Sequence, residues 1–288
     1  MASSYPKVKK IYRRGLIILA LLAATVWIAV FSLQRDLLLH VAILDIGQGD
    51  AILSTTSSGS QVLVDGGPAG GGIMRRLGER MPFFDRTIEL VIATHADADH
   101  IGGLIEVLSR YRVKYVLTSG VISDTATFRA FTEKLTASGA IVITPRPGMK
   151  LWLDGSTLIE VLGPPENFFA TDSNETSIVV RLRYGKTAIL LTGDAPISEE
   201  DAILAAGRSI RSNLLKVGHH GSRSSTGDAL LLATFPDFAA ISVGKKNRYG
   251  HPNEEVLSRL AAHNITVDRT DEQGTVEYVS DGVTLKKQ

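Results

Sequence analysis

The chain has 288 residues, 44% of them hydrophobic and 21% charged, and is long enough to bury a full hydrophobic core. It contains no cysteine, which excludes disulfide bonds and thiolate metal sites. Residues 1–35 carry 6 of the 31 basic groups and no acid, so residues 36–288 hold 25 basic and 30 acidic groups, a net charge of −5. A mildly acidic domain argues against broad, non-specific binding of nucleic acid.

The N-terminal part contains an apolar segment, residues 15–34, without a formal charge. At about 1.5 Å per residue, a helix of this length spans a bilayer core of about 30 Å. Basic residues precede it. The positive-inside rule therefore predicts a basic cytoplasmic tail at 1–14, a transmembrane anchor at 15–34 and an extracytoplasmic domain at 36–288. The alternatives are a cleaved signal peptide, whose apolar region is normally shorter at about 7–15 residues, and a buried helix.

After the anchor, the sequence predicts one continuous domain of strands with helices at intervals. Strands are expected at 40–54 (bent at 47–49), 61–64, 88–94, 140–144, 151–153, 157–162, 178–184, 187–192, 214–217, 239–243 and within 266–286. Helices are expected at 73–80, 101–111, 127–138, 227–234 and 253–263, and one more begins at Ser198. A mostly antiparallel pattern of this kind favours two sheets covered by helices over a doubly wound parallel sheet.

The most informative stretch reads His-Ala-Asp-Ala-Asp-His and offers four metal ligands in six residues: His95, Asp97, Asp99 and His100. It follows an apolar run at 90–93 and precedes Gly102-Gly103, so a tight turn after a buried strand can aim several of these side chains at one point. Imidazole and carboxylate hold hydrolytic divalent metals. The pattern predicts a metal-dependent hydrolase, and a plain polar loop is the alternative.

Two later strands also end in side chains that can bind metal. Asp194 follows an apolar strand and Gly193, which alone is also a frequent turn pattern. Beside the first motif, Asp194 is better explained as a carboxylate shared by two ions about 3.5–4 Å apart, because a shared anion reduces their repulsion. His219 and His220 end a further strand. Adjacent residues at a turn point in different directions, so we expect one of them to be a ligand and the other to contact substrate or scaffold.

Further residues have a functional and a structural interpretation of similar weight. Asp65 is either a turn aspartate or a carboxylate that orients a ligating histidine. The segment 47–50 is either a bulge or a place where backbone approaches a ligand. Asn174 either caps a loop or lends its amide to the site. The loop 245–251 is either solvated or contacts phosphate and base through its cations, its tyrosine and its histidine.

The motif His-x-Asp-x-Asp-His-x-Gly-Gly is preceded by Asp-Gly-Gly and followed by Gly-Asp, His-His-Gly-Ser and Tyr-Gly-His-Pro, in that order. This series resembles the metallo-β-lactamase superfamily. Residues 44–51 and 215–222 are similar in particular to the C-terminal domain of ComEC-type DNA-uptake (competence) proteins. The resemblance implies an α+β fold, a metallo-β-lactamase-like αββα sandwich with the metal site at one edge of the two sheets, preceded here by one N-terminal transmembrane helix.

The resemblance also implies a ligand set: His95, Asp97, Asp99, His100, Asp194 and one of His219 and His220. The superfamily usually has histidine where this chain has Asp97, and a further histidine on the loop that here contains Asn174. Asn174 is therefore a candidate substitute for that imidazole. A site richer in carboxylate is harder, so we expect two divalent ions that are Zn²⁺ or Mn²⁺.

The predicted function is metal-assisted hydrolysis of DNA, most of all single-stranded DNA, at the cell surface during DNA uptake. Metal-bound water has its pKa lowered from about 15.7 toward about 7. Asp99 could also hold the attacking water. Candidates for a cation that stabilises the phosphoryl oxygens are Lys245, Lys246, Arg248 and His251.

Competence proteins of this type carry a many-helix channel, whereas this chain has one predicted span. We therefore expect either a separate channel partner or a surface hydrolase that has only this domain in common. One alternative is a hydrolase of another exported substrate, such as a lactone, an ester or an envelope phosphate, which the acidic balance favours. Another is a non-catalytic module that binds DNA or a channel.

Overall fold

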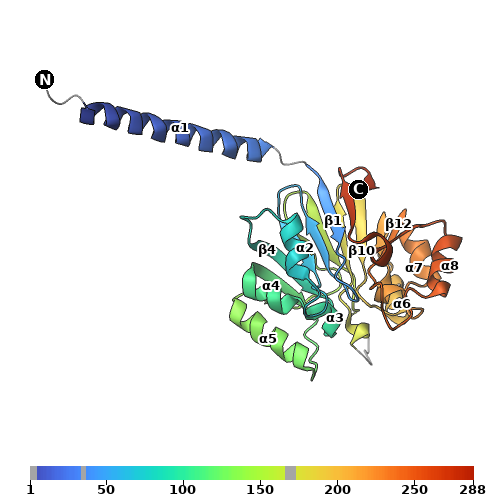
Figure 1. The fold of residues 1–288 in the computed structure, drawn as a ribbon. Coiled ribbons are helices and arrows are strands. Elements are labelled where there is room, and N and C mark those ends of the chain that lie inside the picture. Colours follow the sequence, from blue (N-terminus) through green and yellow to red (C-terminus); the bar gives the residue numbers. More distant parts are fainter. Residues whose placement is uncertain (1–4, 34–36, 166–172) are drawn as a thin grey trace. The chain divides into compact units, whose positions relative to one another are not determined.

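The computed structural model describes residues 5–33, 37–165 and 173–288, which fall into two units, Met1–Leu37 and Leu38–Gln288 (Figure 1). The described part of the first unit is mainly one helix, α1 (Tyr5–Leu33). Its stretch Lys9–Ile28 has a mean hydropathy of 1.7 and is long and apolar enough to cross a membrane, a property that signal sequences also have.

The second unit contains two sheets. The first sheet has the order β15-β14-β1-β2-β3-β4-β5-β6 and the second β13-β12-β11-β10-β9-β8-β7. The strands of the first sheet are β1 (Leu39–Ile43), β2 (Ile52–Thr55), β3 (Gln61–Val64), β4 (Thr87–Ala93), β5 (Arg112–Thr118), β6 (Ile141–Ile143), β14 (Val276–Ser280) and β15 (Leu285–Lys287). Those of the second are β7 (Lys150–Trp152), β8 (Thr157–Val161), β9 (Val180–Tyr184), β10 (Thr187–Leu191), β11 (Leu214–Lys216), β12 (Phe238–Ile241) and β13 (Thr266–Arg269).

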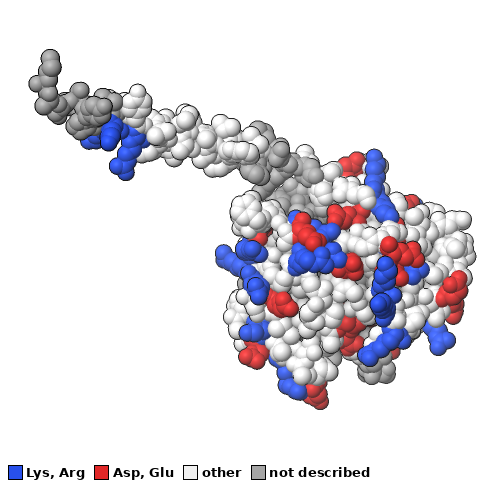
Figure 2. All heavy atoms as spheres, in the orientation of Figure 1, with Lys and Arg blue, Asp and Glu red and all other residues white. Residues whose placement is uncertain are grey.

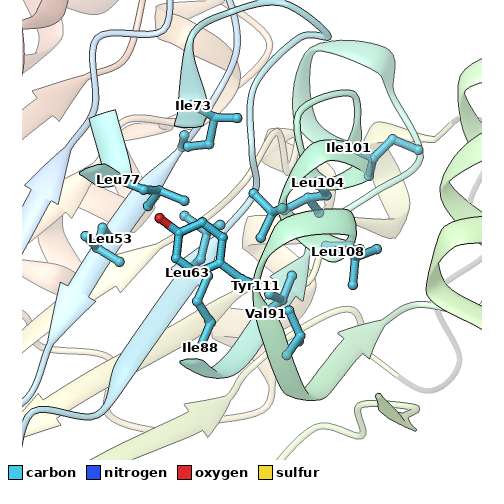
Figure 3. Packing of buried hydrophobic residues seen from close by; sticks show 14 of the residues in the cluster. Leu53, Leu63, Ile73, Leu77, Ile88, Val91, Ile101, Leu104, Leu108 and Tyr111 are labelled. Atoms are coloured by element: carbon cyan, nitrogen blue, oxygen red, sulfur yellow. The ribbon is translucent and has the colours of Figure 1, made fainter. Parts of the chain in front are cut away.

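Helices cover the outer face of each sheet, as Figure 1 shows. The helices are α2 (Ile73–Arg80), α3 (Ala98–Ile101), α4 (Leu104–Arg110), α5 (Ala126–Ser138), α6 (Ile197–Ala205), α7 (Asp228–Thr234), α8 (Glu254–Ala262) and α9 (Thr270–Gln273), with 3₁₀ turns η1 (Asn174–Thr176) and η2 (Gly218–Gly221). Side chains of α2 and α4 pack on β2, β3 and β4 (Figure 3). A second buried cluster lies between the sheets, and a third joins the second sheet to α6, α7 and α8. The predicted αββα sandwich is confirmed.

Both sheets are mixed, and the expected antiparallel pairs are only a narrow majority, seven of the thirteen among the described strands. Among the described strands, six of the thirteen pairs are parallel: β3–β4, β4–β5, β5–β6, β10–β11, β11–β12 and β12–β13. Most of these parallel pairs are connected through helices, because a chain that continues in the same direction needs a crossover connection. Strand β5 is missing from the predicted elements, and the predicted helix 101–111 is divided into α3 and α4.

The two sheets meet at the carboxyl ends of β1, β3, β4, β10, β11 and β12. There, the amide of Ile178 donates to the carbonyl of Thr94 (2.9 Å) and Ser242 Oγ donates to the carbonyl of Gly49 (2.7 Å). The backbones of the two halves approach so closely that a Cβ on Gly244, after β12, would lie 2.7 Å from the amide nitrogen of Gln48, after β1. The loops after these strands are therefore held against one another, and they carry the predicted site residues.

Candidate metal centre

The loop after β4 turns directly into α3 and carries the His95–His100 motif. The rings of His95 and His100 are buried, and their centroids lie 4.1 Å apart. The side chains of Asp97 and Asp99 are 42% and 34% exposed. The Oγ of Ser173 donates to Asp97 (2.5 Å). The motif thus contributes two buried imidazoles and two partly exposed carboxylates.

Three histidine nitrogens surround one oxygen of Asp194. Asp194 Oδ2 lies 3.4 Å from Nε2 of His100, 3.5 Å from Nε2 of His220 and 3.7 Å from Nε2 of His219. Nε2 of His220 is also 3.5 Å from Asp99 Oδ2. The structure therefore brings together the loops after β4, β10 and β11, which are far apart in sequence.

These residues fit a divalent metal. Nε2 of His95, His100 and His220 is buried, and none of these atoms has a hydrogen-bond partner among the described residues. Ligand atoms bound to one tetrahedral ion at about 2.1 Å lie about 3.4 Å apart, which is the spacing around Asp194. Four overlapping groups among the described residues could hold an ion, and the two that do not include Asp50 are His95, His100 and Asp194, and Asp99, His100 and His220.

Asp65 sits behind His100. Its Oδ1 accepts from the amide of Thr94 (2.8 Å), and its Oδ2 contacts Thr94 Oγ1 (2.7 Å) and His100 Nδ1 (2.8 Å). A carboxylate on Nδ1 fixes the ring so that Nε2 faces the centre.

His219 and His220 diverge, because both have left-handed backbone conformations, with φ of 49° and 54°. His220 is buried, and its Nδ1 lies 2.9 Å from the carbonyl of Ser242, which directs Nε2 to the cluster. The His219 side chain is 28% exposed and its ring lies 5.8 Å from that of His251. The geometry favours His220 as the ligand and His219 as a residue at the mouth of the site.

The ionisable groups are strongly coupled. Burial alone would lower the pKa of His100 and His220, but neighbouring carboxylates, Asp194 foremost, raise the pKa of His100 well above its usual value and that of His220 to about 9. Burial, followed by the charge of His100, lowers the pKa of His95 to about 4. The cluster is therefore an anionic cage that binds positive charge, whether as protons or as metal ions.

Sequence reasoning missed the pair Lys216 and Asp50. Both side chains are buried and form an ion pair next to Asp194. A signal was present in the sequence, because Lys216 is a lone cation in an apolar strand and such a residue needs a buried partner. Neither interpretation of the segment 47–50, a bulge or a close approach of backbone to a ligand, gives a role to the Asp50 carboxylate.

The remaining predicted residues lie on loops near the exposed side of the site, where His219 lies. His251 lies beside His219, whereas Lys245, Lys246 and Arg248 are exposed. In the described part of the chain, none of these three cations forms an ion pair with a cluster carboxylate, and Arg248 instead lies over the ring of Tyr249 (5.4 Å). Asn174 begins η1, directly after Ser173, and remains a candidate for the missing imidazole.

Comparison with known proteins agrees with this fold. Residues 44–245 match the metallo-β-lactamase superfamily. The chain is 32% identical over 259 residues to ComE operon protein 3 of Bacillus subtilis (83% of this chain, 33% of the relative), and 32% identical over 241 residues to Recombination protein 2 of Haemophilus influenzae (82% and 28%). It therefore spans about a third of the length of these relatives.

Solved structures show the same fold at low sequence identity. CmlA β-hydroxylase from Streptomyces venezuelae aligns with a TM-score of 0.54 at 16% identity, covering 80% of this chain and 52% of that one. Zn²⁺-bound PqqB from Methylobacterium extorquens aligns with a TM-score of 0.53 at 11% identity, covering 80% and 97%.

Proposed function

Because the chain belongs to the metallo-β-lactamase superfamily, we propose that it is a metal-dependent phosphodiesterase that cleaves DNA, in particular single-stranded DNA, during DNA uptake. The observation that carries this proposal is the convergence of His100, His220 and Asp99 with Asp194. DNA is the proposed substrate because a further relative, 28% identical over 242 residues (83% of this chain), is Competence protein ComA of Neisseria gonorrhoeae.

The proposed ligands are His95, Asp97, Asp99, His100, Asp194 and His220, holding two ions of Zn²⁺ or Mn²⁺. Bound there, the ions would lower the pKa of water to about 7 and stabilise charge on phosphoryl oxygens.

The protein's own groups have separate roles around this centre. Asp65 holds the ring of His100, and the carbonyl of Ser242 holds that of His220. The partly exposed Asp99 can accept a hydrogen bond from the attacking water. His219 and His251, at the mouth, can donate to phosphoryl oxygens.

We also propose that α1 anchors the protein in the cell membrane, with a cytoplasmic tail at 1–14, a span at 15–34 and the catalytic domain, 36–288, outside. The basic residues before the apolar stretch support this orientation. Among the described helices α1 is the one candidate span, and a channel protein for the passage of DNA is a proposed partner.

The test is incubation of the full-length chain, in mild detergent, with single-stranded DNA and either Mn²⁺ or Zn²⁺. We expect metal-dependent loss of the DNA, abolished in Asp99→Ala and retained in the control Asp281→Ala, whose carboxylate accepts from the amides of Val283 and Thr284 in a loop after β14. DNA that is bound but left intact would identify a non-catalytic module instead.

A second candidate is a hydrolase of a smaller exported substrate, such as a lactone, an ester or an envelope phosphate. The charge of the domain favours it: residues 36–288 sum to −5, and Figure 2 shows basic and acidic side chains interspersed on the visible face of the second unit. Turnover of a lactone or of a simple phosphodiester, with DNA left intact, would establish this alternative.

A further inference from the structure

We propose that Lys216 is a positioning residue of the metal centre: its ammonium group fixes which oxygen of Asp194 faces the ions and keeps Asp50 from binding them. This inference rests on the metal centre proposed above. It does not depend on the identity of the substrate.

Lys216 is placed as an internal cation. It is the last residue of β11, and its side chain is fully buried. Its Nζ forms an ion pair with Asp50, donates to the carbonyl of Gly193 (3.0 Å) and lies 3.7 Å from Asp194 Oδ1. The ammonium group thus donates one hydrogen bond to a carbonyl, and its positive charge lies between the carboxylates of Asp50 and Asp194.

The two carboxylate oxygens of Asp194 have different surroundings. Its Oδ2 faces the three imidazole nitrogens, whereas its Oδ1 faces Lys216. Oδ1 has no hydrogen-bond donor among the described residues, so the ammonium charge is what holds this oxygen on the far side. Without Lys216, the carboxylate could rotate, and it would no longer present Oδ2 alone to the imidazole nitrogens.

Asp50 would otherwise compete for metal. Its carboxylate completes two further groups of potential ligands, one with Asp194 and His220 and one with Asp65 and His100. Its Oδ1 is 3.3 Å from His220 Nδ1. Pairing with Lys216 neutralises Asp50 and draws its other oxygen toward β11.

The charges then balance. Asp50 and Lys216 cancel, which leaves the four carboxylates Asp65, Asp97, Asp99 and Asp194 to match two divalent ions. A buried pair with only a structural role can be replaced by neutral side chains at little cost. A positioning role predicts that such a replacement preserves the fold and damages metal binding.

The experiment is Mn²⁺ titration of the metal-free full-length protein, followed by electron paramagnetic resonance. The double variant Lys216→Met/Asp50→Asn removes both charges together. The matched control Lys287→Met/Asp268→Asn removes another lysine–aspartate pair, which links β15 to β13. For the wild type and the control, we expect two bound ions with a spin-coupled spectrum.

For the double variant, we expect at least about 10-fold weaker binding of the second ion and loss of the coupled spectrum, at a melting temperature close to that of the control. Coupled ions bound with unchanged affinity would overturn the proposal. Should the methionine variant not fold, Lys216→Gln/Asp50→Asn gives the same comparison with a polar side chain. The readouts involve no DNA, so failure of the proposed nuclease activity leaves the result unaffected.

Discussion

Asp65 and His100 lie 35 residues apart in the chain, and both side chains are completely buried, yet Asp65 Oδ2 is 2.8 Å from His100 Nδ1. The contact joins the loop after β3 to α3. It leaves Nε2 of His100 facing Asp194. The ring of His100 therefore has one orientation, set from behind by a carboxylate.

Replacement of Asp65 tests this contact. An asparagine can still hydrogen-bond to Nδ1 but removes the negative charge that makes the imidazole a strong ligand. For Asp65→Asn, we expect metal affinity to fall about 10- to 100-fold, the usual range for loss of such a partner. Calorimetric titration with Mn²⁺ and Zn²⁺ measures it, and Asp85→Asn, whose carboxyl accepts from the amide of Thr87, is the control. Equal affinity in both variants would contradict this role.

The two adjacent histidines give a matched pair of variants. His220 is buried against Asp99 and Asp194, whereas His219 is part-exposed at the mouth. We expect His220→Ala to lose at least about 100-fold in metal affinity, beyond the range for an outer partner. His219→Ala should retain its metal and lose turnover only. Metal content by atomic absorption, beside DNA cleavage rates, distinguishes the two; retention of both ions by His220→Ala would show that the ligand role belongs elsewhere.

The loop after β12 is the proposed contact for the DNA backbone. Lys245, Lys246 and Arg248 are exposed there. Changing all three to alanine should weaken single-stranded DNA binding and reduce the slope of log affinity against log salt by about 0.7 for each phosphate that is no longer neutralised. Fluorescence anisotropy at several salt concentrations measures the slope, and metal content should not change. An unaltered slope would place the DNA elsewhere.

A buried carboxyl on α6 makes stability depend on pH. Glu199 is fully buried, and burial, followed by the charges of Glu200 and Glu175, raises its pKa to about 9. Between its usual value of 4.5 and about 9, the folded protein keeps a proton that the unfolded chain releases. The free energy of unfolding therefore falls as pH rises through this window.

Glu199→Gln removes that dependence. We expect the variant to match the wild type near pH 4.5 and to exceed it at pH 8.5 by more than about 1.4 kcal/mol, the equivalent of one pKa unit. Urea unfolding at both pH values, in the presence of chelator, measures the difference. Glu133→Gln on the exposed face of α5 serves as the control. An equal effect of Glu199→Gln at both pH values would show that no proton is held there.

Much of the architecture could be predicted because local patterns determine it. Alternating or continuous apolar runs indicated most strands, and His95, Asp194 and His219 each directly follow such a run, or come within a few residues of its end. Parallel pairing was underestimated because it depends on helical crossovers between β3 and β6 and between β10 and β13, which periodicity does not report. Strand β5 was missed because only part of its sequence is buried.

The candidate site was harder to predict where it depends on contacts distant in sequence. Asp50 and Lys216 are 166 residues apart, and no local pattern connects them. The divergence of His219 and His220 follows from two left-handed backbone conformations that non-glycine residues rarely adopt, so sequence alone did not separate their roles. The sequence supplied the residue types, and the fold supplied their orientation.

The hydrogen bonds behind the histidines, from Asp65 and from the carbonyl of Ser242, are made entirely by protein groups. The orientation of these two histidine rings is thus set by contacts within the protein, without the help of a bound ion. A protein built in this way can fold first and then bind whichever metal ions its surroundings supply. Which element occupies the centre then becomes a matter of local abundance as much as of ligand chemistry.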